Sequence, residues 1–116
     1  MEILCNGVIL ADRVKICDNI FSKTRGLMLS RPLKKGQGLV LRANEEGVLE
    51  TTIHMMFVFF GIDVVWVNGG MEVVDVRENI RAFTPLIVPK KAAKYVIELP
   101  TGTARHVNVG DVIEFN

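Results

Sequence analysis

The segment from Ile53 to Val67, read as IHMMFVFFGIDVVWV, is the most apolar part of this 116-residue sequence and constrains the fold most strongly. One imidazole, His54, and one carboxylate, Asp63, interrupt it. Such a segment becomes the centre of a core or the wall of a binding surface, because burial removes its apolar side chains from water. We therefore predict a sheet element around which the other strands fold. From Met55 to Phe60 odd and even positions are both apolar, so neither face of that element is expected to meet water.

Short apolar or alternating segments bounded by turn residues predict strands on both sides of this run. In chain order, the expected strands are 3–5, 8–10, 14–17, 38–41, 48–53, 62–67, 72–77, 95–99 and 112–115. Asn6-Gly7 suits a tight hairpin turn with positive φ at both central residues. Asp18 or Asn19 can cap one short helix near residues 20–29, and Pro32 prevents its continuation.

These elements predict a mainly-β fold in a single domain covering residues 1–116. The domain is a small barrel or sandwich of about eight or nine short strands with one helix. A chain of this length closes a core without metals or disulfides, and no linker or repeat divides it.

The composition excludes several classes of partner and site. A formal net charge of +1 gives no long-range field for nucleic acid or for an anionic membrane. The pairs Lys34-Lys35 and Lys90-Lys91 are interpreted as solvated loop charges. The apolar run is too short for a membrane helix, which needs about 20 residues. We expect a soluble cytoplasmic protein, because the first residues lack the pattern of a signal peptide.

Two cysteines, Cys5 and Cys17, are too few for a disulfide scaffold or a zinc site. A reduced pair is favoured over a bridge, which stays an alternative if the first strands pair. With only two scattered histidines, no metal and no cofactor are expected.

His54 and Asp63 each have a structural and a functional interpretation. In the structural interpretation His54 is hydrogen-bonded at the edge of an apolar layer. In the functional interpretation it is a catalytic base with a pKa close to working pH. Asp63, in an apolar strand, must be hydrogen-bonded, paired or protonated. Asp63 forms an acid–base pair with Asp75 only in the register in which Val67 faces Met71 across the hairpin turn. In the alternative register Val67 lies opposite Glu72, and Asp63 then faces Val76. The favoured interpretation is an Asp63 that accepts backbone N–H groups or pairs with an arginine.

Arg25 has two interpretations of equal weight. Its guanidinium lies at a pocket rim, or it fastens the helix to the sheet through a buried carboxylate such as Glu98. Glu98 lies between Ile97 and Leu99 in a predicted strand, so its side chain points to the face opposite theirs. Solvent exposure is therefore the simplest expectation for Glu98. The candidate ligand-binding residues are His54, Asp63, Arg25, Met28 and Trp66; no catalytic residue is assigned.

Six blocks in order carry a resemblance to a known family. They are Thr24-Arg25-Gly26-Leu27-Met28, Gly36-Gln37-Gly38-Leu39-Val40-Leu41, Ile53-His54-Met55-Met56-Phe57, Ile62-Asp63-Val64-Val65-Trp66, Tyr95-Val96-Ile97-Glu98-Leu99-Pro100-Thr101-Gly102 and Val109-Gly110-Asp111-Val112. From about Val8 to Asn116 the chain resembles the family called domain of unknown function 192. The resemblance implies a compact mainly-β domain and supplies neither an activity nor site residues.

Three functional hypotheses follow. The first is a non-enzymatic binding or accessory module with a cleft for a small molecule or peptide beside His54, Asp63 and Arg25. The second is an enzyme that uses His54 or the Asp63/Asp75 pair for acid–base chemistry. The third is a structural role in a homo-oligomer, with the Met55–Phe60 run at a subunit contact.

Overall fold

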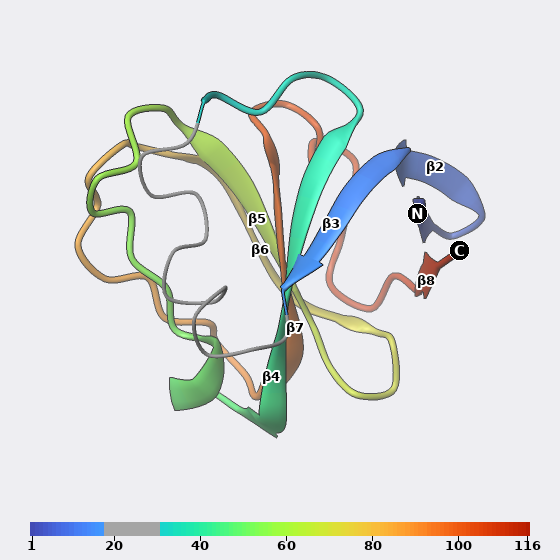
Figure 1. The fold of residues 1–116 in the computed structure, drawn as a ribbon. Coiled ribbons are helices and arrows are strands. Elements are labelled where there is room, and N and C mark those ends of the chain that lie inside the picture. Colours follow the sequence, from blue (N-terminus) through green and yellow to red (C-terminus); the bar gives the residue numbers. More distant parts are fainter. Residues whose placement is uncertain (18–30) are drawn as a thin grey trace.

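Eight β-strands and one short 3-10 helix form the regular structure of residues 1–17 and 31–116, the parts of the chain that the computed structural model describes (Figure 1). The helix predicted near residues 20–29 lies outside these described residues. The elements are β1 (Ile3–Cys5), β2 (Val8–Ala11), β3 (Arg13–Cys17), β4 (Gln37–Gly47), η1 (Leu49–Thr51), β5 (Ile62–Val67), β6 (Val73–Ile80), β7 (Ala93–Pro100) and β8 (Ile113–Phe115). The prediction of a mainly-β fold is confirmed. No helix in this part of the chain is long and apolar enough to cross a membrane.

The strands form two sheets, of order β2-β1-β8 and β3-β4-β7-β5-β6 (Figure 1). Among the described strands, only β3 and β4 pair in parallel, and the other ladders are antiparallel. The sheets meet where β2 continues into β3, and where a single bridge joins Glu72 to Val112. The described strands therefore form two linked open sheets and no closed barrel.

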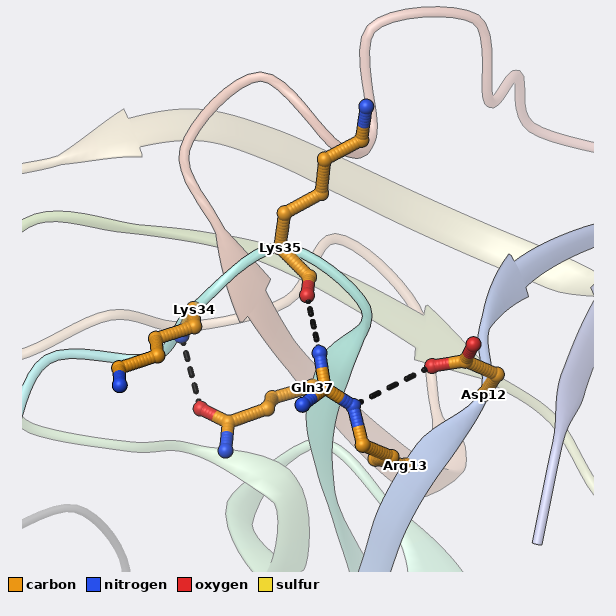
Figure 2. Close-up of polar contacts among 5 residues, drawn as sticks. All are labelled: Asp12, Arg13, Lys34, Lys35 and Gln37. Carbon is orange, nitrogen blue, oxygen red and sulfur yellow. Dashed lines mark hydrogen bonds and ion pairs between the residues drawn. The ribbon is translucent and has the colours of Figure 1, made fainter.

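The bend between β2 and β3 is fastened to the turn that precedes β4 (Figure 2). The Arg13 guanidinium donates to the carbonyl of Lys35 at 2.6 Å and lies 3.5 Å from the Asp12 carboxylate. The backbone N–H of Lys34 donates to Oε1 of Gln37 at 2.8 Å. Lys34 and Lys35 are exposed, and both ammonium groups extend away from these contacts, so their interpretation as solvated charges is confirmed.

The predicted first hairpin is confirmed, with β1 and β2 joined at Asn6 (φ 49°) and Gly7 (φ 81°). Both turn residues have the positive φ that a tight type I′ turn requires, which explains the Asn-Gly pair at this position.

The five-stranded sheet is buried on both faces. One face packs on the three-stranded sheet, where Ile3 and Ile113 contact a layer that includes Val65 and Ile97. The opposite face carries Trp66, which is fully buried under the segments that contain Met55, Val58 and Ile87. All six residues of β5 are buried, as expected for a strand with covered faces and a neighbour on each side.

Residues 48–53 were expected to form a strand, and this prediction is wrong. β4 instead continues to Gly47, and the 3-10 helix η1 follows. The Thr51 hydroxyl donates to the Gly47 carbonyl at 2.7 Å and the Thr52 hydroxyl to the Val48 carbonyl at 2.9 Å. Such local bonds to backbone carbonyls favour a helical turn over a ladder. The Thr51 carbonyl then accepts the indole N–H of Trp66 at 2.8 Å, which ties η1 to the core.

The apolar run also departs from its prediction, because only Ile62–Val67 is a strand. Residues 54–61 form a loop, and Ile53 makes only an isolated bridge with Ile87. The expectation that neither face of this run meets water is wrong as well. Met55 and Val58 point into the core, whereas Phe57 and Phe59 are 50% and 63% exposed.

The β5–β6 hairpin forms as predicted, but in neither register considered from the sequence. Val67 lies opposite Val73 and Trp66 opposite Asp75. Irregular steps on both sides of Val64–Trp66 shift the pairing, and a β-bulge of this kind adds a residue that alternation cannot reveal.

Candidate functional site

Asp63 is a fully buried carboxylate whose two oxygens are both used by the backbone. Oδ1 accepts the N–H of Asn79 and Oδ2 accepts the N–H of Ala104, each at 2.9 Å. The side chain has no exposed surface. The favoured interpretation, an aspartate that satisfies backbone N–H groups, is confirmed. Asp63 therefore joins β5 to β6 and to the turn after β7.

Asp75 has a similar role at a different place. Its oxygens accept the N–H of Val76 at 2.9 Å and of Lys90 at 3.0 Å. The register that would make it a partner of Asp63 is not the observed one. The two carboxylates hold separate backbone segments, so the structure offers no geometric support for an acid–base pair.

The remaining candidate residues are not gathered at one place. His54 is exposed, and its Nδ1 accepts the N–H of Met56 at 3.2 Å, which confirms the hydrogen-bonded interpretation. Trp66 is fully buried in the core. Arg25 and Met28 lie outside the described residues. Of the five candidates, only His54 is seen at the surface, and its binding role stays a prediction.

Glu98 contradicts the expectation of solvent exposure. It lies on β7, the middle strand of the larger sheet, opposite Leu39 on one side and Val64 on the other. Only 5% of its surface is exposed, and no residue in the described ranges donates a hydrogen bond to its carboxylate. This burial raises the pKa of Glu98 from 4.5 to about 7. Alternation correctly placed it on the face opposite Ile97, but both faces of this sheet are covered.

The surface beside His54 is built by two loops, residues 52–61 and 81–92, which run side by side (Figure 1). Ile53 and Ile87 exchange backbone hydrogen bonds of 3.0 and 2.8 Å. Met55 donates to Thr84 at 2.7 Å and accepts from Phe83 at 2.9 Å. The four bonds make a short ladder outside the two sheets, so each loop fixes the conformation of the other.

Each loop contains a tight turn with a phenylalanine at its third position. The turn Met55–Val58 closes with a 3.1 Å backbone bond and has Phe57 at φ 59°. The turn Arg81–Thr84 closes at 3.3 Å and has Phe83 at φ 63°. Tight turns with positive φ at the third position favour Gly or Asn there. A bulky residue in this conformation is rare and costs about 1–2 kcal/mol.

Both strained turns direct their phenylalanine outward. The rings of Phe57 and Phe59 meet the ring of Phe83 edge to face, with centroids 6.3 and 4.9 Å apart. The three side chains, named here the phenylalanine cluster, are 40–63% exposed. Sequence reasoning singled out Phe57 and Phe59 but missed Phe83, since the only local signal was one aromatic residue in a proline-containing loop. Backbone positions strained in this way cluster at functional sites.

We expect Phe57→Gly to be more stable than Phe57→Ala by about 1 kcal/mol, because glycine alone adopts positive φ without cost. At Phe59, whose φ is not positive, the order should reverse, with Gly less stable than Ala by about 0.5–1 kcal/mol. Urea unfolding of the four variants measures both differences. If Gly is the less stable residue at both positions, the left-handed turn at Phe57 is incorrect.

Cys5 is not an activated nucleophile. Its Sγ donates to Oδ2 of Asp111 at 3.6 Å, and it is not bridged to Cys17. Burial and, secondarily, the adjacent Asp111 carboxylate raise the pKa of the Cys5 thiol from 9.0 to about 11. In the described segments, no group of three or more histidine, cysteine or acidic residues is placed to hold a metal ion.

We expect Cys5 to be alkylated by iodoacetamide at pH 8 roughly 100-fold more slowly than an ordinary thiol, in proportion to its thiolate fraction. Asp111→Asn should accelerate the reaction by removing the neighbouring negative charge. Peptide mapping by mass spectrometry separates Cys5 from Cys17. A wild-type rate equal to that of an unfolded cysteine would show that the thiol is not shielded.

Comparison with known proteins identifies the family and the fold. A family model, DUF192, described as "Uncharacterized ACR", matches residues 3–115. The UPF0127 protein of Thermococcus sibiricus is 38% identical over 111 residues, covering 94% of this chain and 70% of that protein. The UPF0127 protein of Pyrococcus abyssi is 39% identical over 105 residues, covering 89% of this chain and 86% of that protein.

A solved structure, a protein of unknown function from Novosphingobium aromaticivorans, has the same fold. It superposes with a TM-score of 0.81 at 18% sequence identity, over 88% of this chain and 74% of that chain. The match to the DUF192 family model spans nearly the whole chain, and the UPF0127 relatives agree with it. The chain therefore belongs to DUF192, a family whose biochemical role is uncharacterised.

Proposed function

We propose that this protein is a non-catalytic binding module, and that the phenylalanine cluster binds a peptide segment of a partner protein. The observation that carries the proposal is the pair of strained turns that expose Phe57 and Phe83. Aromatic side chains on rigid backbone are typical anchors of protein interfaces, because they bury a large area and lose little conformational entropy. His54 lies at the start of the loop that carries Phe57 and Phe59, and it adds an exposed polar side chain there.

Two further observations support a binding surface over a structural one. The core face of each loop is already filled by Met55, Val58 and Ile87, which are all at most 2% exposed. The two loops hold each other through four backbone bonds, so the rings are not needed to fix the loops. As part of this proposal we place the protein in the cytoplasm, which suits the unbridged Cys5 and Cys17.

The test is a selection of peptides from a displayed random library on the immobilised full chain, followed by NMR titration of the ¹⁵N-labelled chain. We expect shift changes concentrated in residues 53–59 and 81–88. Phe59→Ser should remove binding, whereas Ile9→Ser, an exposed apolar residue on β2, should leave it intact.

Shift changes located on the β2-β1-β8 sheet, or binding unaffected by Phe59→Ser, would contradict the proposal. Sedimentation of the free chain is the companion measurement. A stable dimer that Phe59→Ser dissociates would assign the cluster to a second copy of the chain instead of a peptide.

A further inference from the structure

The segment that contains Phe83 is basic although the whole chain is nearly neutral. Between residues 77 and 92 there are four basic side chains and one acidic side chain, while the entire chain has a formal net charge of +1. The loop 52–61 contains no carboxylate. The basic residues in this segment are Arg77, Arg81, Lys90 and Lys91, and the acidic one is Glu78.

Three of the basic residues lie at the two ends of the loop that carries Phe83, and none of the three has an acidic partner among the described residues. Arg81 opens the turn that exposes Phe83, and Lys90 and Lys91 end the same loop. None of these three forms an ion pair with a carboxylate of residues 1–17 or 31–116. Asp75, which accepts the backbone N–H of Lys90, is itself 3% exposed, so the surface presents the positive charges.

Arg77 adds a fixed cation to this face. Its guanidinium donates to the Val88 carbonyl at 2.8 Å and lies 6.0 Å from the centroid of the Trp66 ring. The hydrogen bond holds Val88, a partly exposed residue of the same loop, against β6. A planar guanidinium held in this way is suited to a carboxylate.

From this arrangement we infer that the bound segment is an acidic peptide, with apolar side chains that pack on the rings and carboxylates that meet the basic residues at the loop ends. The inference rests on the proposed function and specifies its partner. Complementary charge on two binding surfaces sets partner choice and association rate. An anionic membrane is the less favoured occupant, because lipid-binding sites usually gather about 4–8 basic residues and this loop offers three exposed ones.

The test measures binding of the full chain to three short fluorescent peptides that share the same apolar residues and are spaced by glutamate, glutamine or lysine. Vesicles that contain phosphatidylserine are the fourth arm. We expect the glutamate peptide to bind at least about tenfold more tightly than the lysine peptide, with affinity falling as salt rises. The double variant Lys90→Glu/Lys91→Glu should reverse this preference. Lys34→Glu/Lys35→Glu, a matched exposed pair elsewhere on the surface, should leave it unchanged.

The outcomes separate this inference from the proposed function. Equal affinity for the three peptides, lost in Phe59→Ser and unaffected by Lys90→Glu/Lys91→Glu, would overturn the acidic partner and leave a binding module. Binding only to vesicles that contain phosphatidylserine, and only with Phe59 present, would replace the peptide by a membrane surface. Binding of none of the peptides or vesicles would contradict both proposals.

Discussion

Replacing Asp63 by alanine should destabilise the protein by about 3–5 kcal/mol. The change leaves the N–H groups of Asn79 and Ala104 without an acceptor and opens a cavity in a fully buried position. Asp63→Asn should cost about 2–3 kcal/mol, because one backbone N–H then faces the amide NH₂ of the new side chain. Urea unfolding at neutral pH measures both values.

The matched control for this experiment is Asp12→Asn. Asp12 is an exposed aspartate whose partner, Arg13, is also exposed, and an ion pair of that kind contributes little. We expect a change within about 0.5 kcal/mol. If Asp63→Asn were as mild as the control, Asp63 would not be the connection between β5 and the two segments it bonds.

Glu98 should give the wild-type protein a stability that falls as pH rises. Because the folded-state pKa of about 7 lies above the value of 4.5 for an unperturbed Glu, the folded state keeps the proton longer than the unfolded chain does. The free-energy cost of ionising the buried Glu98 in the folded state is absent below about pH 4.5. It grows between about pH 4.5 and 7 and is constant above pH 7. A shift of this size corresponds to about 3 kcal/mol across the window.

Glu98→Gln should remove this pH dependence and raise the stability at pH 8 by up to about 3 kcal/mol, since glutamine cannot ionise. Unfolding curves at several pH values compare it with Glu114→Gln, which changes an exposed glutamate on β8 and should keep the wild-type slope. Equal slopes for wild type and Glu98→Gln would show that Glu98 is not buried in the folded chain.

Most strands could be predicted because their signals are local. Asn6-Gly7 marks the first hairpin, and the predicted strands 62–67, 95–99 and 112–115 overlap strands that form. The pairing of distant strands has no such signal. Nothing local places β7 between β4 and β5, and for this reason alternation predicted an exposed Glu98 where the sheet buries it.

The candidate site was less predictable, for a physical reason. The run from Met55 to Phe60 has the composition of a buried strand, and a phenylalanine at positive φ breaks the rule by which turns are recognised. Phe83 contributes to the same surface only because Met55 and Thr84 pair across the loops. Asp63 was noticed as an isolated charge, but the irregular pairing between Ile62 and Val64, where Asp63 lies, cannot be read from alternation.

The central claim, that the phenylalanine cluster binds a partner and does not belong to the core, is tested most directly by the dissociation constant of a selected peptide for Phe59→Ser relative to the unchanged chain. Urea unfolding verifies that both proteins are folded under the binding conditions. Because the Phe59 ring is largely exposed, their free energies of unfolding should differ by less than about 1 kcal/mol. We predict a dissociation constant raised at least about tenfold. An unchanged constant would contradict the account.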